Sequence, residues 1–247
     1  MNRIASYTLI YFTLVLGMGP MILFALFLFL GSFTLINLGL GTNQALLFDA
    51  CLSLLFFCQH SIMIRRSFRG LLSGIISDDY YPAFYALASG AVLLMVMVFW
   101  QKVPNVIYTS DGISYWILRV FFFGSIAGFQ WGARSLGSFD ALGIKRIQRL
   151  LRNRETRELP LTAKGAYRWV RHPLYFFSLL MIWSCPVLTA DRLIFNILWS
   201  LWIVVATMLE EQDLIHDFGD QYRTYQTQVP MIIPYRIPRQ GMAGMSS

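Results

Sequence analysis

Residues 165–175 read Gly-Ala-Tyr-Arg-Trp-Val-Arg-His-Pro-Leu-Tyr and stand immediately before an apolar run. Pro173 fits the first position of a helix, where a missing backbone N–H costs nothing. A second apolar run follows after a short turn and ends in the Glu210-Glu211 pair. Because helices joined by a short hairpin are antiparallel neighbours, we expect these glutamates at the same face as the two cations before Pro173, namely Arg171 and His172.

The composition of the whole chain indicates the class of protein. Hydrophobic residues make up 56% of the 247-residue chain and charged residues only 13%, against about a quarter in ordinary globular proteins. Several apolar runs approach or exceed the roughly 18–20 residues that cross a bilayer. We therefore predict an all-α fold, a polytopic transmembrane helical bundle of about six spans, with five as the alternative count. A C-terminal helical hairpin and a cytoplasmic C-terminal segment complete it.

The apolar runs give the expected spans and their irregularities. The first is interrupted by Gly17, Gly19 and Pro20, so we expect a kink or tilt there. Beyond Leu209 the helical pattern continues through polar residues to a plausible stop at Gly219. The six expected spans are Tyr7–Leu38, Ala45–Met63, Pro82–Trp100, Tyr115–Ala133, Leu174–Leu188 and Leu193–Leu209.

Charge in the loops orients these spans, since Lys and Arg are retained on the cytoplasmic side. Arginines cluster after the second run and between the fourth and fifth, whereas the opposite loops offer little more than Lys102 and Arg192. Both termini are expected in the cytoplasm, at the inner membrane of a bacterium. The net charge of +7 reflects this topology, and without a stacking platform nucleic acid is not expected as a partner. The basic stretch 145–157 is predicted to be an amphipathic helix on anionic lipid headgroups, with a solvated loop as the alternative.

The chain is expected to divide into N-terminal spans, residues 1–135, and a site-forming part, residues 136–247. Ionisable groups at a span end call for a partner or a function. A structural reading remains open, in which Arg171 contacts headgroups, His172 starts a helix and the glutamates form a salt bridge.

Several motifs resemble a known family. The stretch 165–175 is followed by Glu-Glu-x-x-Leu at 210–214, Phe-Gly-x-x-Tyr-x-x-Tyr at 218–225, and Val-Pro. Together they resemble the C-terminal half of the isoprenylcysteine carboxyl methyltransferase and phospholipid methyltransferase superfamily. Upstream, Phe-Cys-Gln-His-Ser-Ile-Met at 57–63 and Gly-Ser-Phe-Asp-Ala-Leu-Gly at 137–143 are similar to the nurim and methanethiol S-methyltransferase branch.

The resemblance implies a membrane enzyme that uses S-adenosyl-L-methionine without a Rossmann domain. The sequence agrees with this, because it contains no Gly-x-Gly-x-x-Gly motif after a strand. In such a site a guanidinium can pair with the cofactor's carboxylate, and a carboxylate can accept from its ribose hydroxyls or ammonium. Tyr222 and Tyr225 would close the site or act as interfacial anchors. The cofactor-binding residues carried over by the resemblance are Tyr167, Arg171, His172, Pro173, Tyr175, Glu210 and Glu211.

The expected acceptor is a small thiol such as methanethiol, giving dimethyl sulfide. Because the thiolate is the nucleophile, we expect catalysis by His60 as a base, with Gln59 or Ser61 orienting it and Arg171 as a cation. A core histidine is the alternative for His60, and Asp140 could instead orient an Arg or His. No metal is expected, because His60, His172 and His216 lack ligand spacing.

Two other functions remain open at this stage. One is methylation of a lipid-linked acceptor, either a prenylcysteine carboxylate or a phospholipid amine. The other is a non-catalytic, nurim-like membrane protein. Membrane lipids are expected as neighbours in each case, and the oligomeric state is left open.

Overall fold

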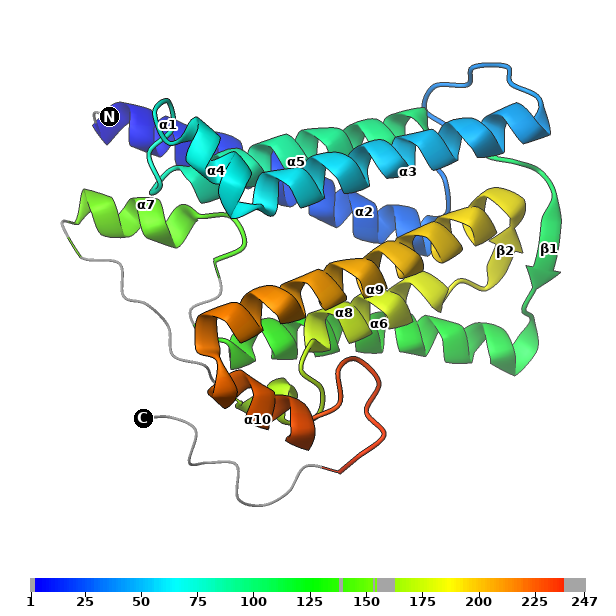
Figure 1. Ribbon diagram of the computed structural model, residues 1–247. Coiled ribbons are helices and arrows are strands. Elements are labelled where there is room, and N and C mark those ends of the chain that lie inside the picture. Colours follow the sequence, from blue (N-terminus) through cyan, green and yellow to red (C-terminus); the bar gives the residue numbers. More distant parts are fainter. Residues whose placement is uncertain (1–2, 138–139, 153, 155–162, 238–247) are drawn as a thin grey trace. The chain divides into compact units, whose positions relative to one another are not determined.

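The structure is a computed structural model that describes residues 3–137, 140–152, 154 and 163–237, and most of these residues are helical (Figure 1). This confirms the predicted all-α class. The helices are α1 (Arg3–Thr13), α2 (Gly19–Leu30), α3 (Thr42–Ile64), α4 (Arg66–Leu72), α5 (Tyr81–Phe99), α6 (Gly112–Ser135), α7 (Ile144–Leu151), α8 (Pro173–Trp183), α9 (Ala190–Phe218) and α10 (Asp220–Gln228). A π-helical turn η1 (Leu14–Met18), a 3₁₀ turn η2 (Gly165–Arg168) and strands β1 (Val106–Thr109) and β2 (Val187–Thr189) complete the described elements.

Five helical stretches in the described part are long and apolar enough to cross a membrane. They are Arg3–Leu30, Thr42–Ile64, Tyr81–Phe99, Gly112–Ser135 and Ala190–Phe218. The remaining apolar helix, α8, has 11 residues and is only about 16 Å long at 1.5 Å per residue. The segment that the sequence marked as its shortest span is therefore too short to cross as a helix alone.

The first span ends earlier than predicted. Its helix stops at Leu30, not Leu38, because Gly31 adopts a left-handed φ of +91°, a conformation that ends helices and suits glycine. The expected irregularity at Gly17 and Gly19 is the π-helical turn η1, which lies between α1 and α2. Gly90 on α5 is needed at this point, since a Cβ there would lie 1.9 Å from the carbonyl oxygen of Leu16.

The described residues fall into two compact units. The first comprises Met1–Ile107, Asp140–Arg157 and Thr189–Leu198, and the second comprises Tyr108–Phe139, Glu158–Leu188 and Trp199–Ser247. In the first unit α5 is central, because α1, η1, α2 and α3 all pack against it. The same unit contains α7, which packs on α1.

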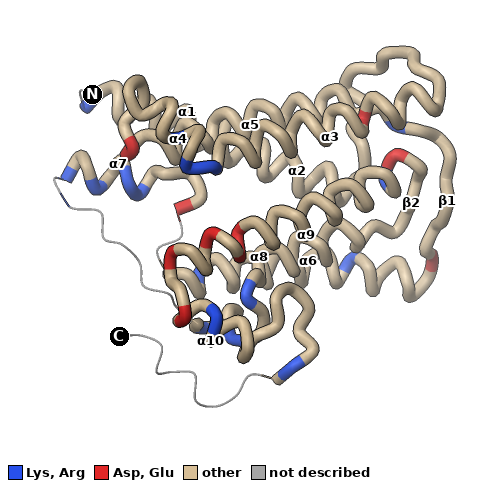
Figure 2. The backbone as a smooth tube through the Cα atoms, viewed as in Figure 1, with Lys and Arg blue, Asp and Glu red and all other residues tan. Residues whose placement is uncertain are grey.

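The basic segment predicted as an amphipathic helix is helical in α7, and Figure 2 shows Lys and Arg along it. Ile147 on this helix is fully buried, whereas Arg146 pairs with Asp79 at 2.9 Å between Nε and Oδ1. The predicted helix extended to residue 157, and its residues 153 and 155–157 lie outside the described part. Its predicted contact with lipid headgroups stays a prediction.

A buried polar cluster surrounds the first turn of α9 in the first unit, where the sequence indicated only a turn. Asp191 accepts hydrogen bonds from the indole N–H of Trp100 at 3.2 Å and the backbone N–H of Val103 at 3.3 Å. The guanidinium of Arg192 donates to the carbonyl of Leu28 at 3.0 Å. Because this carbonyl lies in the last turn of α2, Arg192, which the sequence placed in a loop, caps the end of that helix.

In the second unit α8 packs along α6, and the contact depends on small residues. A Cβ on Gly128 of α6 would lie 2.1 Å from the ring of Phe177 on α8. The indole N–H of Trp183 at the end of α8 donates to Ser200 of α9 at 2.9 Å, so the hairpin expected from the sequence is present. Between its arms the turn contains β2, which pairs with β1, a pairing that the sequence did not indicate.

At its other end α9 runs past the apolar residues to Phe218, as the sequence predicted, and stops at Gly219 with φ +54°. Helix α10 then folds back, and a hydrophobic cluster of Ala163, Tyr222, Tyr225 and Val229 packs against the last turns of α9. This returns the C-terminal segment to the stretch 165–175.

Candidate active site

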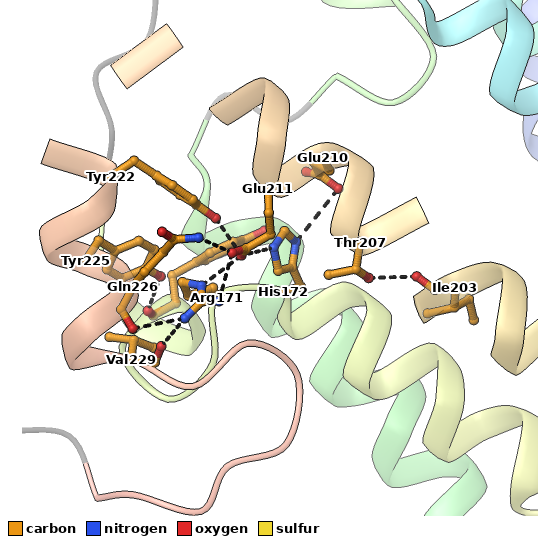
Figure 3. A network of polar contacts seen from close by, with 11 residues as sticks. Arg171, His172, Ile203, Thr207, Glu210, Glu211, Tyr222, Tyr225, Gln226 and Val229 are labelled. Carbon is orange, nitrogen blue, oxygen red and sulfur yellow. Dashed lines mark hydrogen bonds and ion pairs between the residues drawn. The ribbon is translucent and has the colours of Figure 1, made fainter. Parts of the chain in front are cut away.

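A bidentate ion pair between Arg171 and Glu211 lies at the centre of the second unit's polar residues (Figure 3). Nε of Arg171 lies 2.7 Å from one carboxylate oxygen and Nη2 lies 2.8 Å from the other. Both side chains are only 9% exposed. The predicted meeting of the two helix ends is therefore confirmed for Arg171, His172 and Glu211.

Glu211 accepts hydrogen bonds from three further side chains. His172 Nε2 and the Tyr222 hydroxyl each lie 2.8 Å from its Oε1, and the Gln226 amide donates to its Oε2. We call Glu211 with Arg171, His172, Tyr222 and Gln226 the Glu211 network. A carboxylate offers about four lone-pair positions, so the protein itself occupies the acceptor capacity of Glu211.

The C-terminal segment holds the Arg171 side of this network. The third guanidinium nitrogen of Arg171, Nη1, donates to the carbonyls of Gln226 at 3.2 Å and Val229 at 2.6 Å. The backbone N–H groups of Arg171 and His172 donate to the carbonyls of Pro230 and Met231 at 2.8 and 3.0 Å. Gln226 was missed by sequence reasoning because it lies in a short polar run that looks like any solvated helix.

The charges of the network stabilise one another. Burial disfavours the charged form of Arg171, but the hydrogen bonds and charge of Glu211 outweigh burial, so that the pKa of Arg171 is raised. For Tyr222 the two effects act in the same direction. Burial raises the pKa of its hydroxyl, and the hydrogen bond to Glu211 raises it further. Arg171 therefore stays a cation and Tyr222 a neutral donor, which is the arrangement that a fully ionised Glu211 requires.

Glu210 differs from its neighbour because it remains accessible. Its side chain is 44% exposed, and its Oε2 lies 3.7 Å from Nδ1 of His172. The His172 ring stacks on Tyr175 with centroids 5.6 Å apart and planes at 18°. Burial raises the pKa of Tyr167, and the charge of Glu210 raises it further.

Local sequence explains how the 165–175 stretch turns into the site. Gly165 has φ +56°, and the following N–H of Ala166 donates to the hydroxyl of Ser135 at 3.1 Å, which ties η2 to the end of α6. Pro173 starts α8, as predicted, directly after His172 at its N-cap. The hydroxyl of Tyr225 donates to the carbonyl of Tyr167 at 2.5 Å.

The other predicted catalytic residues, Gln59 and His60, belong to the first unit. Nε2 of His60 lies 2.6 Å from the Tyr85 hydroxyl on α5, and the Gln59 amide donates to Met63 and to Ser89. Neither Tyr85 nor Ser89 was singled out from the sequence, because a Tyr and a Ser in an apolar run have no distinctive spacing. The roles of Gln59 and His60 stay predictions.

Asp140 was considered as an orienting residue for a histidine or arginine of the site. Its Oδ2 instead accepts from the backbone N–H of Arg146 at 3.0 Å, at the start of α7. The neighbouring Phe139 of the same motif lies outside the described residues.

Comparison with known proteins agrees with these motifs. A family model described as "Protein of unknown function (DUF1295)" matches residues 84–229, more than half of the chain. The chain is 31% identical to methanethiol S-methyltransferase 2 of Bradyrhizobium diazoefficiens over 83% of this chain and 82% of that protein. It is 32% identical to the methanethiol S-methyltransferase of a Pseudomonas strain over 83% of this chain and 80% of that protein.

A more distant similarity reaches an animal protein. Nurim of Rattus norvegicus is 27% identical over 69% of this chain and 68% of nurim. No solved structure matches the chain. The matches confirm the branch that the Gln-His-Ser and Phe-Asp segments indicated, and the chain belongs to the DUF1295 family and to the family of the methanethiol S-methyltransferases.

Proposed function

We propose that this protein is an integral membrane methyltransferase that moves a methyl group from S-adenosyl-L-methionine to a small thiol such as methanethiol, giving dimethyl sulfide. The observation that carries the proposal is the Glu211 network. It joins the 165–175 stretch, the end of α9 and the C-terminal segment through hydrogen bonds and ion pairs, with the half-exposed Glu210 at its edge. The names of the relatives supply the reaction class.

The residues present fit S-adenosylmethionine by the chemistry of their donors and acceptors. We assign to Glu210 the cofactor's ammonium or ribose hydroxyls, because its carboxylate remains half exposed. The Tyr175 ring, which stacks on His172, and the Tyr167 phenol offer aromatic contact. The bound cofactor would supply an electrophilic methyl group on a sulfonium.

Arg171 and Glu211 take a different role in this proposal from the one the sequence suggested. All three guanidinium nitrogens of Arg171 already donate to Glu211, Gln226 or Val229. Pairing of Arg171 with the cofactor's carboxylate would break this arrangement. We therefore assign Arg171, Glu211, Tyr222 and Gln226 the task of holding His172, Tyr175 and Glu210 in place.

The acceptor's proton needs a separate group, because an ordinary thiol is mostly protonated at neutral pH. We assign this task to His60, whose imidazole lies among apolar and aromatic side chains of α3 and α5. A membrane setting keeps water away from the thiolate and favours transfer to carbon over reprotonation.

We further propose that the protein lies in the inner membrane of a bacterium with both termini in the cytoplasm. Six crossings are needed for this. The helix α8 contributes about 16 Å, and residues 184–189, of which Val187–Thr189 form β2, add roughly 20 Å at about 3.3 Å per residue when extended. Together they are long enough for the sixth crossing.

A non-catalytic membrane protein is the second candidate, and the similarity to nurim favours it. In that case the Glu211 network would serve only to fasten the C-terminal segment, and no cofactor would bind. A lipid-linked acceptor is the third, in which a carboxylate substrate would need no base.

One pair of measurements on the purified, detergent-solubilised protein separates these functions. We expect calorimetry to detect S-adenosylmethionine binding, and gas chromatography of the headspace to detect dimethyl sulfide when methanethiol is added. Binding without a volatile product would reject the thiol acceptor, whereas absence of binding would reject the enzyme and favour the nurim-like function.

A further inference from the structure

Four polar side chains of α3 and α5 lie partly buried in the first unit and form two hydrogen-bonded pairs. The Tyr85 hydroxyl lies 2.6 Å from Nε2 of His60, and Ser89 follows Tyr85 one turn later on α5. Ser89 Oγ accepts from the Gln59 amide at 3.4 Å. We call Gln59, His60, Tyr85 and Ser89 the α3–α5 polar cluster. Polar side chains within helices that can cross a membrane are costly and mark functional sites.

The cluster has an unfilled hydrogen-bonding position. Oε1 of Gln59 is buried and has no partner among the described residues, while Nε2 of the same amide donates to Met63 and Ser89. Turning the amide over exchanges its oxygen and nitrogen, but one of the two atoms then still lacks a partner. A buried amide atom without a partner costs free energy, and a small polar ligand would relieve that cost.

The surroundings of the cluster restrict what that ligand can be. The His60 ring lies between Phe56 and Tyr85, with centroids 5.2 and 5.0 Å away. The thioether of Met63 lies 2.9 Å from the Gln59 amide. Aromatic and thioether surfaces favour a soft, uncharged group with a short apolar tail.

We propose that the α3–α5 polar cluster is the acceptor site for a small thiol and that Tyr85, not His60, is the residue that meets the thiol sulfur. This inference rests on the proposed methyltransferase function. The thiol docks with its S–H toward Oε1 of Gln59. Because an S–H turns easily about its C–S bond, the same proton can then reach the oxygen of Tyr85.

The proton transfer is a relay through the short Tyr85–His60 hydrogen bond. The S–H bond breaks and its proton passes to the Tyr85 oxygen, while the phenol proton of Tyr85 passes to Nε2 of His60. The thiol sulfur keeps the electron pair of the S–H bond and uses it for the new S–C bond. A bound methyl donor would supply the methyl carbon, and its sulfonium sulfur would keep the electrons of the S–C bond that breaks. Tyr85 is thereby a catalytic residue, and His60 acts through it.

The test compares methanethiol with methaneselenol, which is already ionised at neutral pH and needs no base. With the purified full chain, Tyr85→Phe is expected to lower turnover of methanethiol by about 10²–10⁴-fold, the usual contribution of acid–base catalysis. Turnover of methaneselenol should stay within a few-fold of the unmodified protein. His60→Gln should show the same selectivity, because it removes the other end of the relay.

Tyr81→Phe is the matched control. It removes a buried hydroxyl from the same helix, where Tyr81 donates to the backbone carbonyl of Met63, and should leave the ratio of the two substrates unchanged. Calorimetry with S-adenosylmethionine is the folding control, because a variant that still binds this cofactor is folded. Equal losses on both substrates, or no loss on methanethiol, in either relay variant would overturn the acceptor site. If the unmodified protein methylates neither substrate, the proposed function itself fails.

Discussion

At the scale of single residues, Glu210 and Glu211 show how two identical neighbours acquire different tasks. The Glu211 side chain is 9% exposed and accepts from four side chains, whereas the Glu210 side chain is 44% exposed. Their side chains face different surroundings because adjacent helical residues point about 100° apart. We therefore expect Glu211 to determine stability and Glu210 to determine binding.

Glu211→Gln tests the structural half of this division. The change leaves the buried guanidinium of Arg171 without its counter-charge, and breaking a buried ion pair costs about 3–5 kcal/mol. We expect a lower thermal midpoint in detergent and easier proteolysis of the C-terminal segment. An unchanged midpoint would show that the network contributes little to folding.

Glu210→Gln is the matched change one position earlier. It should leave the thermal midpoint almost unaltered, because a half-exposed side chain away from the core contributes within about 0.5 kcal/mol. Loss of a charge-assisted hydrogen bond should weaken S-adenosylmethionine binding about 10-fold, as calorimetry can measure. Equal affinities of Glu210→Gln and the unmodified protein would remove Glu210 from the cofactor site.

The sequence predicted the charged members of the network, but not which of them would stabilise the fold and which would bind the cofactor. Arg171, His172 and the glutamates stand out because ionisable groups at a span end require partners. Gln226 and Tyr85 do not stand out, because their importance arises only from the atoms that the fold brings to them. Which glutamate is enclosed depends on the orientation of α9, and a motif alone does not encode that orientation.

At the scale of elements, some helix ends follow from local sequence, and the contacts between helices do not. Pro173 and Gly219 set the boundaries of α8 and α9 as predicted, through the fixed φ of proline and the left-handed φ of glycine. The early end of α2 at Gly31 was missed because the residues after it remain apolar. The pairing of β1 with β2 joins segments nearly 80 residues apart, which local patterns do not reveal.

The contact of α6 with α8 gives a prediction at this scale. Gly128→Ala would place a methyl group inside the Phe177 ring, and such overpacking typically costs about 1–3 kcal/mol. Because α8 carries His172 at its start, cofactor binding should weaken together with the thermal midpoint. Gly124→Ala on the same helix is the control, since a Cβ there meets nothing within 4 Å. Equal behaviour of the two variants would contradict the packing described.

At the scale of the whole molecule, the composition decides the class of protein and the loop charges predict its orientation. Five helices have the length and hydropathy to cross a bilayer, and six crossings with cytoplasmic termini require α8 together with the extended residues that follow it. The positive-inside distribution favours this topology. The all-α membrane fold was thus predictable from residue counts, because a chain so rich in apolar residues has few other stable arrangements in lipid.

Cysteine labelling tests the orientation. In a background without Cys51, Cys58 and Cys185, we expect Ser73→Cys and Thr227→Cys to react with a membrane-impermeant maleimide only from the cytoplasmic side. Thr109→Cys should react only from the opposite side. All three positions are exposed. Labelling of positions 109 and 227 from the same side would contradict the six-crossing topology.

The central claim is that the Glu211 network builds the S-adenosylmethionine site, and hydrogen–deuterium exchange with and without this cofactor tests it most directly. We predict slower exchange on cofactor addition in peptides that cover residues 165–175, 207–218 and 222–231, where backbone N–H groups and side chains surround Glu211. Cofactor binding that leaves exchange in all three segments unchanged, or slows it only elsewhere in the chain, would contradict the account.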